Sequence, residues 1–300
     1  MTNSNVALAS LDAAEITARV VRPGGLWREV RVVAETGSTN VDLLAAARVG
    51  AAEGTVLVAE AQTAGRGRLG RRWASPPRAG LTFSVLLRPI GVPAALLGWL
   101  PLLTGVAAAS AVVGAAAADV ALKWPNDVLA GGVKLGGILA ERAGSAIVVG
   151  VGINVWQGRA DLPDGPAATS VALAGAPGSA GPAAGSAGPA AGSAGPAAGP
   201  ALRERLLAEL LGGLARWYLA WRDQASPGDA DACGLRQEYA RRCTTLGREV
   251  AVTMPGGEVV TGTATGVDRS GRLEVRTAHG LATVTAGDVV HVRPANGRGD

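Results

Sequence analysis

The segment with the clearest chemical potential is GRGRLGRRW, residues 65–73, in which glycines alternate with arginines. Glycine lets the backbone approach a ligand closely, and arginine presents a planar fork of N–H donors that suits carboxylate and phosphate groups. We call this segment the arginine loop and interpret it as an anion-binding site. Taken alone, the same residues would also fit a solvated basic loop or a tract that binds nucleic acid.

A second motif, KWPND at residues 123–127, follows an apolar stretch that predicts a strand. Pro125 favours an extended Trp124, and Asn126-Asp127 is typical of a turn. A little further on, Lys134 begins the segment KLGGILAE after two glycines. By itself KWPND indicates no more than a β-turn, but a lysine at this place can face the same cleft as the arginine loop.

Two weaker motifs stand outside these segments. GVGIN, residues 150–154, follows an apolar strand and has half of a dinucleotide-binding fingerprint. It lacks the third glycine and the following helix, so we reject that interpretation. ETGSTN, residues 35–40, could be simply the N-cap of a helix.

Histidine is absent from the first 278 residues, because His279 and His291 are the only two in the chain. This excludes a Ser-His or Cys-His nucleophile pair and a histidine-rich metal centre from most of the sequence. Cys233 and Cys243 cannot by themselves build a zinc site or a disulfide framework. The chemistry must therefore run on Lys, Arg, Asp, Asn, Gln, hydroxyl groups and backbone.

The elements that must position these residues can be read from the apolar pattern. It predicts short helices at residues 11–21 and 41–49 and a long helix within residues 89–118. Strands are predicted at residues 30–34, 55–60, 81–87, 120–124, 133–141 and 145–151. Strands outnumber helices, which favours an α+β fold, a mixed sheet with helices on one face.

The long apolar stretch, residues 89–118, carries no charge and is long enough to cross a membrane. Pro93 and Pro101 interrupt it and its second half is rich in Ala and Gly, so we interpret it as a buried core helix. The start of the chain lacks a signal-peptide pattern, and a net charge of +4 is too small to imply nucleic acid. We expect a cytoplasmic protein with neither membrane nor nucleic acid as a partner.

The composition changes after the predicted sheet. Residues 178–184, 185–191 and 192–198 are three identical copies of GSAGPAA, whose glycines and prolines forbid a helix. We interpret them as a flexible insertion without direct function. Helices are predicted at residues 202–224 and 235–243, and from residue 246 alternation predicts a small barrel of short strands at 249–253, 259–266, 273–277, 282–285 and 289–292.

In this order and spacing, ETGSTN, Gln62 with the arginine loop, KWPND with KLGGIL, and GVGIN resemble the biotin protein ligases, also called biotin–acetyl-CoA-carboxylase ligases. The resemblance is strong over residues 28–173 and looser over 202–293. It implies a class II aminoacyl-tRNA synthetase-like catalytic domain at 28–243, with a low-complexity insertion at 175–200, and an SH3-like barrel at 246–293. Residues 1–27 would be an N-terminal extension without the DNA-binding domain of members that also act as repressors.

The resemblance implies a role for each matching residue. Ser38, Thr39, Asn40 and Gln62 would meet the ureido end of biotin, and Gly150 and Gly152 would let the backbone approach it. Lys134 and Arg68 would be catalytic, with Lys134 at the reacting carboxyl and α-phosphate. The remaining positions close over the carboxylate and adenylate or bind nucleotide: Gly65, Arg66, Gly67, Arg68, Arg71, Trp73, Asn126, Asp127 and Asn154. Asn126, Asp127 and Asn154 would serve either nucleotide or magnesium, and no dedicated metal ligand is identified.

The implied activity uses ATP, with Mg²⁺, to convert biotin into biotinyl-5′-AMP and then joins biotin to a lysine of a biotin carboxyl carrier domain. The same resemblance implies a monomer or weak homodimer with no tightly bound cofactor. Alternatives remain open: a lipoate–protein ligase, which has a related fold and reaction, a biotin-responsive DNA-binding regulator, and an RNA-binding module that uses the arginine loop.

Overall fold

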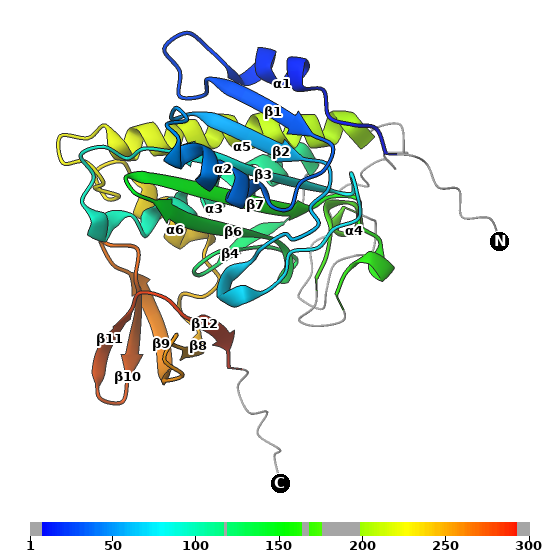
Figure 1. Cartoon of the computed structure of the whole chain (residues 1–300). Coiled ribbons are helices and arrows are strands. Elements are labelled where there is room, and N and C mark those ends of the chain that lie inside the picture. Colours follow the sequence, from blue (N-terminus) through cyan, green and yellow to red (C-terminus); the bar gives the residue numbers. More distant parts are fainter. Residues whose placement is uncertain (1–7, 117–118, 164–167, 176–198, 293–300) are drawn as a thin grey trace.

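A computed structural model describes residues 8–116, 119–163, 168–175 and 199–292, and the GSAGPAA repeats lie outside this part of the chain. The centre is a seven-stranded sheet in the order β1-β2-β3-β7-β6-β5-β4 (Figure 1). Its strands are β1 (Glu29–Val33), β2 (Thr55–Ala59), β3 (Gly80–Leu87), β4 (Val120–Lys123), β5 (Asp127–Ala130), β6 (Val133–Ala143) and β7 (Ala146–Asn154). β1 and β2 are parallel and all other neighbours are antiparallel, which confirms the mixed sheet.

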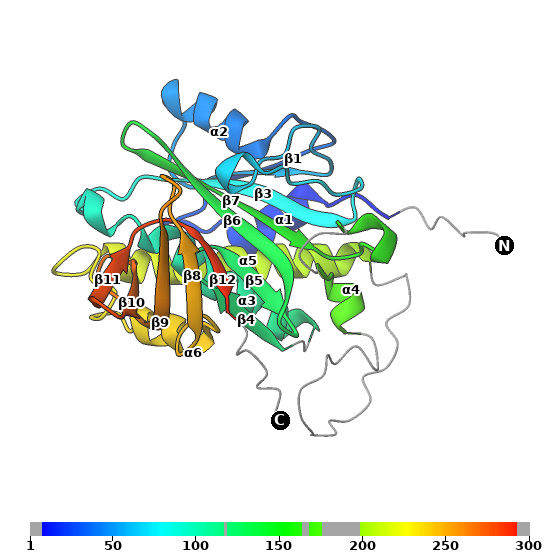
Figure 2. The same ribbon diagram turned by 90° about the horizontal axis from the view of Figure 1, so that it is seen from below.

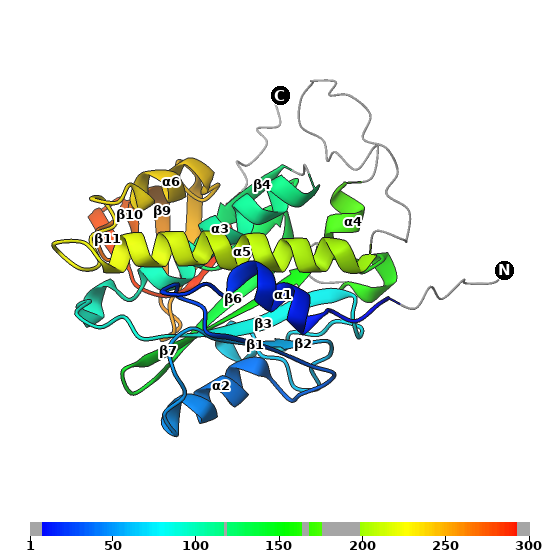
Figure 3. The same ribbon diagram turned by 90° about the horizontal axis from the view of Figure 1, so that it is seen from above.

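The helices lie on both faces of this sheet (Figure 3). One face packs against α1 (Ala13–Val20), α3 (Trp99–Ala116) and α5 (Gly199–Arg222), and α2 (Thr39–Arg48) covers part of the other. β2 is buried along its whole length because Val56 and Val58 enter the large core while Leu57 packs under α2. The expectation of helices on one face was therefore wrong for α2.

The long apolar helix is a core element of this fold. Residues 94–115 are apolar and long enough to cross a membrane by composition and length. In the structure, however, Val106, Ala108 and Val112 are buried, and α3 packs closely along α5. The helix therefore fills the core between the sheet and α5.

A second sheet follows α6 (Leu235–Arg242) and lies beside β4 and β5 (Figure 2). Its strands are β8 (Glu249–Thr253), β9 (Val259–Val267), β10 (Leu273–Thr277), β11 (Gly280–Val284) and β12 (Asp288–His291), antiparallel in the order β11-β10-β9-β8-β12. Two tryptophans of the larger domain hold it, because Trp99 Nε1 donates to Arg269 O at 2.8 Å and Trp124 Nε1 donates to Gly271 O at 3.1 Å.

Short elements complete the described chain: η1 (Arg68–Gly70), η2 (Ala94–Leu96), η3 (Arg159–Asp161) and α4 (Val171–Ala174). One strand was not predicted. The turn of KWPND ends at Asn126, and Asp127 already pairs with Lys123 as the first residue of β5. That pairing places the end of KWPND beside β6, which carries Lys134.

Candidate active site

A large hollow lies on the α2 face of the main sheet, between the arginine loop and β12. It is a cleft of about 930 Å³. Both domains line it: β6 and β7 form its floor, α2 begins at one end, and Val289, Val290 and His291 of β12 stand at the other. The second domain therefore completes the cleft that the first one opens.

The floor of the cleft depends on two glycines of GVGIN. A Cβ built on Gly150 would lie 2.2 Å from Asn40 Oδ1, and one built on Gly152 would lie 2.4 Å from Trp73 Cε2. Real Cβ atoms do not approach other atoms so closely. The two glycines therefore let Asn40 and the Trp73 ring sit directly against the sheet, as well as leaving backbone open to a ligand.

At the inner end of the cleft, Ser38, Thr39 and Asn40 begin α2 and are almost completely buried. Gln62 joins them, because its Oε1 accepts from Thr39 N at 2.8 Å. β1 and β2 are parallel, so the segments that follow them leave the same edge of the sheet and pair at Thr36 and Gln62. The structure thus brings together the four residues expected at the ureido end.

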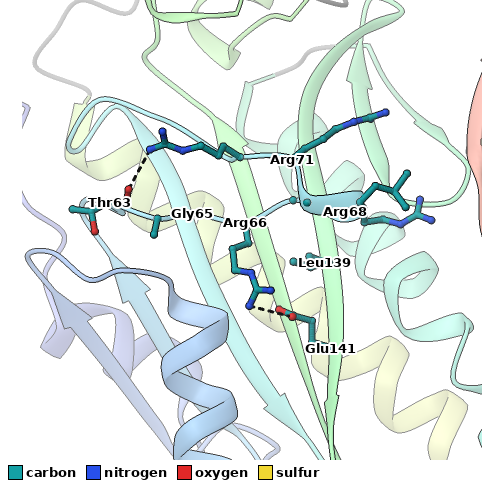
Figure 4. A pocket seen from close by; sticks show the side chains of 12 residues that line it. Thr63, Gly65, Arg66, Arg68, Arg71, Leu139 and Glu141 are labelled. Atoms are coloured by element: carbon teal, nitrogen blue, oxygen red, sulfur yellow. Dashed lines mark hydrogen bonds and ion pairs between the residues drawn. The ribbon is translucent and has the colours of Figure 1, made fainter. Parts of the chain in front are cut away.

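The arginine loop is a small hairpin closed by backbone hydrogen bonds. Trp73 N donates to Gly65 O at 2.9 Å, and Gly67 N donates to Arg71 O at 2.7 Å. Gly65 is required at the base, since a Cβ there would lie 2.3 Å from Trp73 O. Gly65 borders a smaller outer hollow of the loop and is not part of the cleft wall. Arg66 lies in that hollow, paired with Glu141 (Figure 4).

Arg68 is the least exposed arginine of the loop, and it lines the cleft. Its Nη1 donates to Asn126 Oδ1 at 3.0 Å and to Gly287 O at 3.4 Å. Burial lowers the pKa of the guanidinium, while the nearby Asp127 and Asp288 carboxylates oppose that shift. The group stays charged, because even a lowered arginine pKa lies far above neutral. It is therefore a fixed cation at the centre of the site.

Lys134 faces the cleft because of a β-bulge. Regular alternation along β6 would put Lys134 on the core face with Ile138, but the pairing with β5 shifts register between Val128 and Leu129. The shift turns Lys134 to the cleft side, where its Nζ lies 2.6 Å from Asp127 Oδ1. Lysine and aspartate are both half-buried, so the ammonium group is held in place before a ligand arrives.

The outer end of the cleft carries a second group of basic side chains: Lys123 of KWPND, together with Arg248 and His291, which the sequence did not suggest. Burial, with the charges of Lys123 and Arg248, lowers the pKa of His291 to about 4. The imidazole is therefore neutral at pH 7. Beside this group, Arg71 of the loop forms an ion pair with Asp288 of β12, which links the loop to the second domain.

Asn154 borders the cleft, but its amide already has internal partners. It donates to Thr169 O at 3.0 Å and accepts from Gln157 Nε2 at 3.2 Å. Its expected part in nucleotide binding stays a prediction. Two polar residues behind the cleft, Ser84 and Glu141, were missed. Ser84 lies between apolar residues of β3, and Glu141 stands beside Arg142 near the end of β6, where it resembles an ordinary surface charge.

Comparison with known proteins agrees with this geometry. The Biotin/lipoate A/B protein ligase family model matches residues 38–156, and the Biotin protein ligase C terminal domain matches residues 245–292. The chain belongs to the biotin protein ligase family, as its motifs indicated. The two matched segments correspond to the domain that forms the cleft floor and the domain that closes its outer end.

Three relatives illustrate the similarity. The biotin--[acetyl-CoA-carboxylase] ligase of Mycobacterium tuberculosis is 40% identical over 297 residues, which cover 98% of this chain and 100% of that protein. The ligase of the same name from Paracoccus denitrificans is 32% identical, over 86% of this chain and 98% of that one. The structure of the Aquifex aeolicus biotin protein ligase in complex with biotin and ATP superposes with a TM-score of 0.67, at 26% identity, over 89% and 100% of the two chains.

Proposed function

We propose that this chain is an ATP-dependent biotin–protein ligase, which forms biotinyl-5′-AMP and transfers biotin to a lysine of a biotin carboxyl carrier domain. One observation carries the proposal: a single cleft joins a buried polar end, at Thr39 and Gln62, to a pair of fixed cations, Arg68 and Lys134. The names of the relatives from M. tuberculosis and P. denitrificans and the ligands of the A. aeolicus protein support it.

In the first step the biotin carboxylate attacks the α-phosphorus of ATP, a new P–O bond forms and pyrophosphate leaves. Both reactants are anions, so the step needs positive charge that is already in position. Arg68 is held by Asn126, and Lys134 is held by Asp127. The two cations can therefore stabilise charge on the α-phosphate without rearranging, and no protein nucleophile is required.

In the second step the amine of the acceptor lysine attacks the acyl carbon, an amide forms and AMP leaves. The adenylate reacts readily with water, so it must be covered between the two steps. The arginine loop lies over the cleft and is joined to β12 through Arg71 and Asp288, which suits such a cover. The partner is the carrier domain of a carboxylase, and the protein acts as a monomer or weak homodimer.

Mg²⁺ would accompany ATP rather than reside in the protein. Within the described residues no three His, Cys, Asp or Glu side chains gather at one point. Asp127 offers one carboxylate in the cleft, beside Asn126. Magnesium typically keeps phosphate and water as most of its ligands, so one carboxylate fits an ion held chiefly by the triphosphate. Bound there, it would reduce the negative charge of the phosphates.

An ATP–pyrophosphate exchange assay with biotin, lipoate and other carboxylic acids tests the proposal. We expect exchange that depends on biotin, followed by the mass increase of one biotin on a carrier domain. Exchange with lipoate and not with biotin would instead establish a lipoate ligase. A gel-shift assay with duplex DNA, in the presence and absence of biotin, tests the alternative of a biotin-responsive regulator.

A further inference from the structure

A line of polar side chains runs beneath the inner end of the cleft. It starts at Glu141 on β6, whose Oε2 lies 2.8 Å from Asn40 Nδ2. Asn40 Oδ1 lies 2.6 Å from Ser84 Oγ on β3, and Ser84 Oγ lies 2.7 Å from Thr39 Oγ1. Thr39 lines the cleft, whereas Ser84 is completely buried behind it. Glu141 is thus connected to the ligand-binding surface only through other side chains.

Glu141 fixes the orientation of the Asn40 amide. A carboxylate can only accept hydrogen bonds, and the other oxygen of Glu141, Oε1, pairs with Arg66 Nη1 at 3.7 Å. The Asn40 amide must therefore turn its NH₂ group toward Glu141, with its second proton directed to Leu139 O at 3.2 Å. Its oxygen is left facing Ser84.

The orientation of Asn40 then fixes the two hydroxyl groups. Ser84 has one proton and gives it to Asn40 Oδ1, so its oxygen must accept from Thr39. The alternative acceptor for the Thr39 proton is Gln62 Oε1, at 3.1 Å. If Thr39 donated there, its oxygen and the Ser84 oxygen would lie 2.7 Å apart with no proton between them. No water can replace the missing donor, because Ser84 is 0% exposed.

We propose that Glu141 is a positioning residue that makes the inner end of the cleft selective for ring systems with N–H donors. The proposal rests on the proposed function and deepens it. With its proton turned inward, Thr39 Oγ1 presents lone pairs to the cleft, beside Gln62 Oε1, which already accepts from Thr39 N. Two acceptors suit the N–H groups of a cyclic urea. They offer nothing to a dithiolane ring, which has no N–H.

Glu141→Gln tests the proposal, because glutamine keeps the shape and loses the charge. Arg66 attracts the new amide oxygen, so the amide nitrogen faces Asn40. Asn40 then turns, Ser84 donates toward Thr39, and Thr39 donates into the cleft. Calorimetry should show binding of biotin weakened at least tenfold. The affinity for desthiobiotin, which keeps both ureido N–H groups, should fall by the same factor. The affinity for an analogue in which a ring oxygen replaces one ureido N–H should fall by a clearly smaller factor.

Two further variants complete the experiment. Ser84→Ala interrupts the line without touching the ligand or Glu141 and should reproduce the same pattern across the three ligands. Glu29→Gln removes an exposed carboxylate on β1, paired with Arg31, and should leave all three affinities unchanged. An equal loss for every ligand, or unchanged biotin binding in Glu141→Gln, overturns the proposal. A wild-type protein that fails to bind biotin at all would instead contradict the proposed function.

Discussion

The ring of Trp73 occupies the space that a side chain on Gly152 would need, with Trp73 Cε2 2.4 Å from the position of a Cβ. The arginine loop ends at this tryptophan, so the aromatic ring packs the end of the loop against the sheet. We expect Gly152→Ala to displace Trp73 and to weaken biotin binding about 5- to 150-fold, since overpacking of this kind costs about 1–3 kcal/mol. The thermal unfolding midpoint should fall by a few degrees, because the same overpacking destabilises the folded state. Wild-type affinity for biotin in the variant would show that the position of Trp73 does not matter for binding.

Lys134→Ala should slow formation of the adenylate by about two to three orders of magnitude, because it removes a preorganised charge from the site of reaction. Single-turnover measurement of biotinyl-5′-AMP separates this step from transfer. Arg142→Ala, on the same strand and exposed, is the matched control and should react at the wild-type rate. Near-normal adenylation by Lys134→Ala would assign the main electrostatic role to Arg68.

Asp288→Asn should loosen the arginine loop, because it breaks the ion pair with Arg71 that ties the loop to β12. The pair is exposed, so the effect on overall stability should be small, about 0–1 kcal/mol. Amide exchange across residues 65–73 should become faster in the adenylate complex. More biotinyl-5′-AMP should escape and label unrelated lysines, as we also expect for Arg68→Gly. If neither the amide exchange of the loop nor the release of biotinyl-5′-AMP changes, the Arg71–Asp288 ion pair does not hold the loop closed.

His291 should make the protein less stable in acid. Its pKa in the folded state is about 4, below the ordinary 6.5, so between these values the unfolded chain binds a proton that the folded protein does not. The stability that neutral His291 contributes is complete above 6.5 and is lost as the pH falls through the folded pKa. We expect His291→Gln to reduce the pH dependence of the urea midpoint within this window. An identical pH profile would contradict the assignment.

Much of the fold could be predicted because apolar residues recur with the spacing of a helix in the helical segments and of a strand in the strand segments. The alternation in residues 249–253 and the continuous apolar run of residues 55–60 correspond to β8 and β2. β5 was missed because it is only four residues long and its first residue, Asp127, belongs to the turn signal Asn126-Asp127. α2 was placed correctly along the chain, but which face of the sheet it covers depends on packing that no local pattern encodes.

The candidate site was predictable where glycines and cations lie together in sequence, as in the arginine loop. It was not predictable where a partner comes from a distant strand. Ser84 and Glu141 resemble ordinary strand residues until β3, β6 and α2 are brought together. Lys134 faces the cleft only because of a β-bulge, and regular alternation along the strand would have predicted the opposite face. The ion pair of Asp288 with Arg71 can be recognised only once the structure places β12 beside the loop.

The two ends of the cleft come from distant parts of the sequence, so they are translated at different times. Ser38 and Thr39 leave the ribosome early, whereas Val289, Val290 and His291 emerge only after both domains have been translated. A nascent chain that has completed its main sheet would have the inner end of the cleft and the arginine loop but no β12 to hold that loop. Such a chain could bind biotin before it could retain an adenylate. Any adenylate formed by such a chain would escape to nearby lysines, so β12 must be in place before the cleft can act selectively.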